Sequence, residues 1–186
     1  KYPQLKIDLI LEEKVMDLPM READVAIRMK EPSQADLIRR KLMSVRMQLY
    51  ASQAYLEANG TPATLDDLGS HRLISQNAHS AQVSAGALLV REIMSYDVGS
   101  FLTVNNYFGV LQGVIHDLGI GLLPDYLTED FPDLVRVLPE VESNEVPVFL
   151  AYPEELRHSK RIEAFRDFVT DEVIAHRRKR REQEGE

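Results

Sequence analysis

Segments with strand-like and helix-like hydrophobic patterns alternate along most of this chain, and this alternation constrains the fold more than any other feature. Near the start, Leu5 to Leu11 carries an apolar residue at every second position, which predicts a strand. Near the end, apolar residues from Ile162 to Ile174, Phe168 among them, recur at three- and four-residue steps opposite a charged face, which predicts an amphipathic helix. Alternation of this kind predicts an α/β protein.

Further elements follow in the first third of the chain. Ala23 to Ile27 is a short, mostly apolar run, which predicts a strand buried on both faces, as in a parallel sheet. Leu37 to Ser52 is strand-like. Ser52 is a suitable N-cap for a short helix over Gln53 to Asn59, and Gly60 is suited to end that helix.

The rest of the chain continues the alternation. A second short helix is expected after Thr64, whose hydroxyl can cap it. A longer helix is expected over Tyr107 to about Leu118, ended by Gly119. Residues from Gln76 to Gly86 are polar and small, without a clear period, and predict a loop. Further strands are predicted at His71 to Ser75, Leu88 to Met94, Ser100 to Val104, Ile120 to Leu123, Leu134 to Leu138 and Val146 to Tyr152.

Length and composition bound the class of protein. The 186 residues suffice for one domain or for two small lobes, since single cores commonly run to roughly 100–200 residues. No apolar run approaches the roughly 20 residues of a membrane helix. No basic and apolar leader opens the chain, so a cytoplasmic protein is expected. The absence of cysteine excludes disulfides and thiol-based sites.

The net charge of -8 is distributed unevenly. His176 to Glu186 carries five Arg or Lys and three Glu, so the remainder of the chain is the more acidic part. An acidic body repels the DNA backbone, because affinity for nucleic acid rests largely on Lys and Arg. The basic run Arg177 to Arg181 is either a nucleic-acid tail or a solvated helix end, and the glutamates that follow it favour the second interpretation.

The sequence carries no recognisable catalytic motif. It lacks G-x-S-x-G, G-x-G-x-x-G and G-x-x-x-x-G-K-[ST], which serve hydrolase, dinucleotide and nucleotide chemistry. The neighbouring carboxylates Glu12-Glu13 and Asp66-Asp67 are better explained as solvent-facing and helix-start charges than as an acid/base pair. We therefore expect no enzyme, no metal and no other cofactor. The histidines show no metal-ligand spacing: they are His71, His79, His116, His158 and His176.

A set of short segments occurs in a characteristic order over essentially the whole chain. They are Tyr2-Pro3 before a strand, Ala23 to Arg28, Leu49 to Ser52 running into Tyr55-Leu56, Gly60 to Pro62, Leu65 to Leu68 followed by His71, Gly119 to Pro124, Leu134-Val135 with Val137 to Pro139, Val148 to Pro153, and the Ser159 to Phe168 helix. Together these segments resemble the C-terminal, effector-binding domain of LysR-type transcriptional regulators.

The resemblance implies a fold like that of type 2 periplasmic binding proteins, with two Rossmann-like lobes joined by two crossover strands and a ligand cleft between them. Lobe I would hold residues 1–48 and 134–186, and lobe II residues 49–133. The crossings would fall near Met47 to Tyr50 and near Asp130 to Leu134. The family's domain begins with a strand and a helix before the Tyr-Pro strand, and lobe I would lack both here.

The resemblance also implies a function. A small effector, expected to be an organic acid or another anion, would bind between the lobes and change their relative angle. The domains would form a homodimer or homotetramer, with Leu5 to Leu11 as an exposed apolar strip. DNA would be bound by an N-terminal winged helix-turn-helix that this sequence does not contain. The alternative is a free-standing solute-binding protein of a transporter, but the arrangement of Tyr55-Leu56, Gly60 to Pro62 and His71 points to the regulator.

One group of candidate ligand-binding residues lies at the start of the helix that follows Val104. There Asn105, Asn106 and Tyr107 would aim free backbone N–H groups and a positive dipole end toward the cleft that the resemblance implies. Such a helix start is a ready anion site. The alternative is that Asn105 or Asn106 only caps the helix.

Other candidates follow predicted strands. Ser75, Gln76 and Asn77 would offer neutral donors and acceptors, or would form an exposed polar loop. Arg28 follows a strand at the end where α/β sheets place ligands, so its guanidinium could bind a carboxylate, although a surface ion pair is the alternative. Pro124 would line an apolar wall, or would simply end a core strand.

Overall fold

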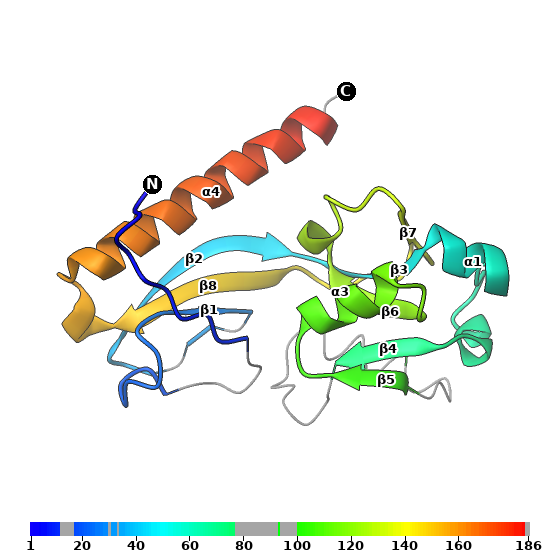
Figure 1. Ribbon diagram of the computed structural model, residues 1–186, viewed down its shortest axis with the longest axis horizontal. Helices are drawn as coiled ribbons and strands as arrows, with labels where there is room; N and C mark the ends of the chain where they lie inside the picture. Colours follow the sequence, from blue (N-terminus) through cyan, green and yellow to red (C-terminus); the bar gives the residue numbers. More distant parts are fainter. Residues whose placement is uncertain (12–16, 30, 33, 77–92, 94–99, 185–186) are drawn as a thin grey trace. The chain divides into compact units, whose positions relative to one another are not determined.

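The structure is a computed structural model that describes residues 1–11, 17–29, 31–32, 34–76, 93 and 100–184 (Figure 1). The chain divides into two compact units. Unit 1 comprises Lys1–Ile10, Val15–Ser44 and Pro147–Glu186, and unit 2 comprises Leu11–Lys14 and Val45–Val146. The lobes predicted from the sequence, residues 1–48 with 134–186 and residues 49–133, have different limits. The division into lobes remains a prediction.

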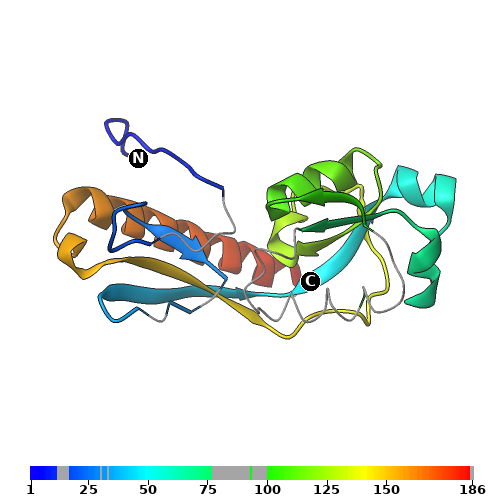
Figure 2. The ribbon, with the colours of Figure 1, turned by 90° about the horizontal axis from the view of Figure 1, so that it is seen from below.

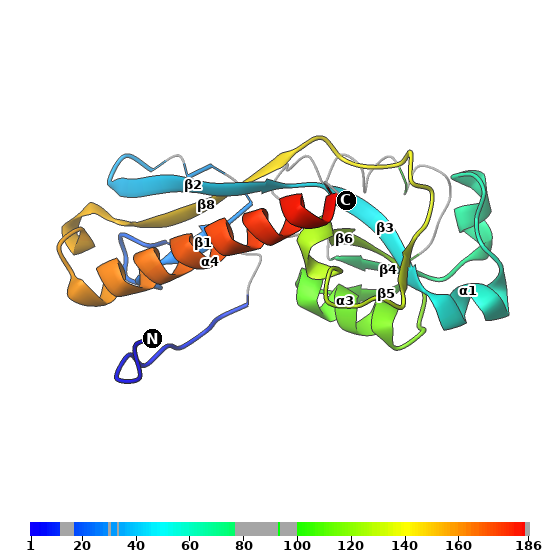
Figure 3. The same cartoon turned by 90° about the horizontal axis from the view of Figure 1, so that it is seen from above.

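Unit 1 is built on a small sheet with the strand order β1-β8-β2. These strands are β1 (Ala26–Arg28), β2 (Leu37–Val45) and β8 (Val146–Pro153). A short 3-10 helix, η3 (Glu154–Leu156), leads from β8 toward the long helix α4 (Lys160–Glu184). Figure 3 shows α4 running along this sheet.

The buried stripe of α4 differs in part from the predicted one. Ile162 is buried, and Phe165, Val169 and Val173 pack against the same core, which includes Leu42, Leu150 and Tyr152 of the sheet. Phe168 and Ile174 are exposed, because a stripe that repeats every three or four residues from Ile162 passes beside them. Past the stripe, the basic run continues the helix, where Arg178 pairs with Glu182 at 2.9 Å.

Two strand predictions in unit 1 need correction. Residues 5–11 form no strand, because a strand requires a hydrogen-bonded neighbour and these residues have none among the described strands. The predicted exposed apolar strip is nevertheless present, with Leu9 76% exposed. The strand predicted at Ala23 to Ile27 is β1. It pairs antiparallel with β8, and Ile27 is 52% exposed, so β1 is neither parallel to its neighbour nor buried on both faces.

Unit 2 is built on a five-stranded sheet with the order β5-β4-β6-β3-β7. Strands β4, β5 and β6 run parallel, whereas β3 pairs antiparallel with β6 and β7. Figure 2 shows α3 against this sheet and α1 beside one end of it. The elements are β3 (Met47–Ser52), α1 (Gln53–Asn59), η1 (Asp66–Ser70), β4 (Leu73–Gln76), β5 (Ser100–Val104), α3 (Tyr107–Ile115), β6 (Ile120–Pro124), η2 (Asp125–Leu127) and β7 (Leu134–Arg136).

Small residues allow α3 to pack closely on the sheet. A Cβ on Gly113 would lie 2.8 Å from the Cδ1 atom of Ile74, and one on Gly121 would lie 2.6 Å from a methyl carbon of Val114. The core cluster beneath α3 is buried and is flanked by partly buried apolar residues. This packing fixes where α3 begins, because the helix cannot slide without forcing Val114 into the sheet.

Helix ends in unit 2 match the predictions in part. As predicted, Ser52 caps α1 by accepting a hydrogen bond from the Tyr55 amide at 3.1 Å, and Gly60 ends the helix at a positive φ of 84°. Thr64 does not cap η1, because its hydroxyl donates to the Asp67 carboxylate instead. Hydrogen bonds from the Thr64 amide, the Thr64 hydroxyl and the Ala63 amide lower the pKa of Asp67. Helix α3 ends at Ile115, earlier than predicted.

Parts of the predictions fall outside the described residues. These are the strand predicted at Leu88 to Met94, apart from Ile93, and the loop predicted after Gln76. No helix in the described part of the chain is both long and apolar enough to pass through a membrane.

Candidate functional site

The parallel strands of unit 2 end at one common edge of the sheet. Gln76, the last residue of β4, pairs in register with Val104, the last residue of β5. Strand β6 runs in the same direction, with Gly121 opposite Ile74, so Pro124 ends β6 at this edge too. In α/β sheets the carboxyl ends of parallel strands are where ligands bind. We call this region the carboxyl edge, defined by Ser75, Gln76, Thr103, Asn105, Asn106, Tyr107 and Pro124.

Helix α3 begins at the carboxyl edge with a side-chain cap. Asn106 has extended backbone angles, and its Oδ1 atom accepts a hydrogen bond from the Gly109 amide at 2.8 Å. Its Nδ2 group donates to Oδ1 of Asn105 at 3.0 Å. The cap satisfies the Gly109 amide of the first turn, and the positive end of the helix dipole remains directed at the edge. Both predicted roles of Asn106, cap and neighbour of an anion site, are thus compatible.

Polar groups from β4 and β5 also lie at the carboxyl edge, where the Ser75 and Thr103 side chains point to the face of the sheet opposite the one on which α3 packs. The hydroxyl oxygens of Ser75 and Thr103 are 3.5 Å apart. The Nε2 group of Gln76 is buried and has no hydrogen-bond partner among the described residues. Buried polar groups in folded proteins are nearly always paired, so an unpaired amide donor is a specific reason to expect a ligand acceptor next to it.

The structure places the predicted site residues unequally. Ser75, Gln76, Asn105, Asn106, Tyr107 and Pro124 all belong to unit 2 and lie at the carboxyl edge. Arg28 ends β1 in unit 1 and is half-buried; burial lowers the pKa of its guanidinium, while Asp17 acts in the opposite direction. An arginine remains charged in either case. Asn77 lies outside the described residues.

One polar residue at the edge was missed by the sequence reasoning. Thr103 lies on the exposed face of β5, one position before the buried-side Val104. The signal was present, because a strand over Ser100 to Val104 directs alternate side chains to the same face. Within the described residues, no group of three or more acidic, histidine or cysteine side chains could hold a metal ion.

The cap itself makes a testable prediction. Replacing Asn106 with alanine should lower the free energy of unfolding by about 1 kcal/mol, because the Gly109 amide loses its acceptor. Asn105→Ala is the matched control: within the described residues its exposed side chain makes one hydrogen bond, accepted from Asn106, so its cost should stay below about 0.5 kcal/mol. Urea unfolding of both variants measures the difference, and equal costs would contradict the assigned cap.

Comparison with known proteins identifies the family. The sequence model of the LysR substrate binding domain matches residues 1–173. A probable HTH-type transcriptional regulator, LtrA of Klebsiella pneumoniae, is 30% identical over 183 residues, which cover 94% of this chain and 59% of LtrA. The chain spans about half the length of the curated relatives that it matches. These relatives are transcriptional regulators, which supports the regulator over the transporter alternative.

Solved structures agree on the fold. The regulatory domain of CrgA, a LysR-type transcriptional regulator from Neisseria meningitidis, matches with a TM-score of 0.68 at 22% identity, covering 84% of this chain and 78% of that chain. The bromide ion-bound regulatory domain of HypT from Salmonella typhimurium matches with a TM-score of 0.62 at 17% identity, covering 85% and 76%. The predicted two-lobed fold of the type 2 periplasmic-binding-protein kind is thereby confirmed. As the order of its short segments predicted, the chain belongs to the LysR substrate binding domain family.

Proposed function

We propose that this chain is the effector-sensing domain of a LysR-type transcriptional regulator and that it binds a small organic acid or another anion at the carboxyl edge of unit 2. The observation that carries the proposal is the buried, unpaired Nε2 donor of Gln76. It lies at the sheet edge where α3 begins, so a donor and a positive helix end can serve one anion.

The remaining candidates extend this proposal. Ser75, Thr103 and Asn77 supply neutral hydrogen-bonding groups for ligand oxygens, and Pro124 supplies an apolar surface. Arg28 is proposed as a carboxylate-binding residue, supported by its half-buried guanidinium at the end of β1. The bromide ion held by the HypT domain, which has a similar fold, is a further reason to test anions first.

We extend the proposal to the whole protein from the relatives. They are HTH-type regulators of which the matched segments cover 54% and 59%, so DNA binding is assigned to an N-terminal winged helix-turn-helix and not to this acidic segment. The regulator is proposed to work as a homodimer or homotetramer in the cytoplasm, where its DNA lies. Its role is ligand binding without catalysis.

A thermal-shift screen of organic acids, aromatic metabolites and uncharged analogues tests the proposed site. A ligand at 100 times its Kd raises the free energy of unfolding by about 2.7 kcal/mol. For a protein of this size, that increase raises Tm by about 5–10 °C. We expect at least one acid to produce such a shift. We expect the uncharged analogue of that acid to produce none.

The Gln76→Leu variant distinguishes a loss of ligand binding from a loss of stability. It removes the unpaired donor, so the ligand-free variant should melt at the same temperature as the wild type or higher, while the response to the acid is lost. Gln53→Leu, at an exposed position on α1, is the matched control and should respond like the wild type. A full response from the Gln76 variant would show that the carboxyl edge is not the site.

A further inference from the structure

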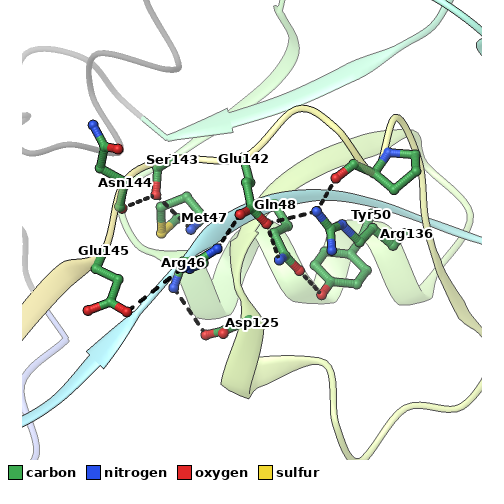
Figure 4. A network of polar contacts seen from close by, with 11 residues as sticks. Arg46, Met47, Gln48, Tyr50, Asp125, Arg136, Glu142, Ser143, Asn144 and Glu145 are labelled. Carbon is green, nitrogen blue, oxygen red and sulfur yellow. Dashed lines mark hydrogen bonds and ion pairs between the residues drawn. The ribbon is translucent and has the colours of Figure 1, made fainter.

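Apart from the short segment Leu11–Lys14, which is also assigned to unit 2, the chain passes between its two units at two places, between Ser44 and Val45 and between Val146 and Pro147. On the unit 1 side, these segments are β2 and β8, which are neighbours in the sheet. On the unit 2 side, the described residues of these segments are paired by only one isolated antiparallel bridge, between Gln48 and Glu142. The segments there are held instead by a side-chain network centred on Glu142, shown in Figure 4.

Glu142 joins the second passage to the first. One carboxylate oxygen pairs with the guanidinium of Arg46, and the other accepts from Nε2 of Gln48 at 3.0 Å. The second oxygen also accepts from Arg136 of β7 at 2.8 Å. The carboxylate is therefore shared by three donors, two of them charged, which makes these bonds stronger than bonds between neutral groups.

Neighbouring contacts fix the orientation of this network. The Tyr50 hydroxyl donates to Oε1 of Gln48 at 2.7 Å, so the amide must present its Nε2 group to Glu142. The Met47 amide donates to the Ser143 hydroxyl at 2.9 Å, and the Ser143 amide donates back to the Met47 carbonyl at 3.0 Å. The two passages are thus joined by backbone and side-chain bonds over a few residues.

The other side of the first passage is fixed as well. The amide of Asp125 donates to the Arg46 carbonyl at 2.9 Å, and the Arg46 amide donates to the Asp125 carboxylate at 3.3 Å. Arg46 therefore joins the end of β6 to Glu142. The hydrogen bond from Gln48 and the two arginines keep the pKa of Glu142 below its usual range, so the carboxylate is charged at neutral pH.

We propose that Glu142 is the residue that clamps the two passages to one another in unit 2, so that they act as one paired hinge and not as two independent tethers. The expected consequence is a narrower distribution of distances between a point in unit 1 and a point in unit 2. The proposal concerns the ligand-free chain and does not rest on the proposed effector site, so either can fail without the other.

Pulsed electron–electron double resonance, which measures the distance between two spin labels, tests the clamp on the whole chain. The sequence contains no cysteine, so Ala58→Cys on α1 and Arg161→Cys on α4 place one spin label in each unit at exposed positions. Glu142→Gln keeps the size of the side chain and removes its charge. Its distance distribution should be about twice as wide as that of the labelled parent, because the hinge loses its shared anion.

Glu145→Gln is the matched control. Glu145 is an exposed carboxylate that contacts the same Arg46 at 3.9 Å but bonds no other part of the network, so its removal should leave the distribution unchanged. Hydrogen exchange supplies a local readout: the Met47 and Ser143 amides should exchange about tenfold faster in Glu142→Gln, and the Val114 amide of α3 at the parent rate.

An unchanged distance distribution in Glu142→Gln overturns the proposal, whether or not the amides exchange faster, because the network would then be a local brace only. An equal broadening in Glu145→Gln also overturns it. If Glu142→Gln does not fold, Gln48→Leu removes one donor from the same carboxylate while both arginines remain. It should widen the distribution in the same direction by less.

Discussion

Replacing Ile74 with alanine is expected to lower the free energy of unfolding by about 3–4 kcal/mol, the cost of a cavity in a core that cannot collapse. Ile74 is 2% exposed and packs beneath α3 with Val110, Val114 and Leu123. Gly113 of α3 lies so close to the Ile74 side chain that a Cβ at position 113 would be 2.8 Å from Cδ1 of Ile74. Urea unfolding at 25 °C measures the loss as a lower midpoint at unchanged slope.

Ile174→Ala is the matched control for this prediction. It removes the same atoms from α4, where Ile174 is 61% exposed, so the change should stay within about 0.5 kcal/mol. Similar losses at the two positions would mean that α3 does not pack on the sheet as described. The position of α3 is central to the account, because α3 begins at the carboxyl edge.

Gly119→Ala is expected to cost about 3 kcal/mol, because the added methyl group would overlap the backbone of the neighbouring strand. A Cβ at this position would lie 2.9 Å from the carbonyl carbon of Arg72 and still nearer its oxygen. That oxygen accepts the Ile120 amide at 2.9 Å, the bond that starts the pairing of β4 with β6. Backbone atoms cannot move aside as a side-chain end can, so the pairing must open.

Gly69→Ala controls for the loss of a glycine as such. A Cβ there would meet nothing within 4 Å, and the residue has no positive φ, so the variant should be within about 0.5 kcal/mol of the wild type. A cost at Gly119 no larger than the cost at Gly69 would contradict the close approach of residue 119 to β4. Thermal unfolding followed by circular dichroism suffices for both variants.

The sequence predicted those features that local patterns determine. Ser52 and Gly60 bound α1 as expected, because capping depends on a few adjacent residues. The helix start after Asn106 was placed correctly for the same reason, and the strand predicted over His71 to Ser75 is present as β4 (Leu73–Gln76). Their meeting at one sheet edge followed from the family resemblance, and the register of β4 with β5 agrees with it.

Features that depend on distant contacts were not predictable in this way. Leu5 to Leu11 has the alternation of a strand, but a strand exists only where another chain segment completes its hydrogen bonds. The Glu142 network joins residues 94 and 96 positions apart, and neither Glu142 nor Arg46 stands in a recognisable motif. The unpaired donor of Gln76 likewise depends on burial, which a polar loop sequence does not indicate.

The central claim is that an anion binds at the start of α3. Its most direct test is nuclear magnetic resonance of the 15N-labelled chain, titrated with the acid that raises Tm most and, separately, with sodium bromide. We expect the largest chemical-shift changes at the backbone amides of Tyr107 and Phe108 and at the side-chain amide of Gln76. Saturable changes confined to other residues, such as those of α4, with these three signals unmoved, would contradict it.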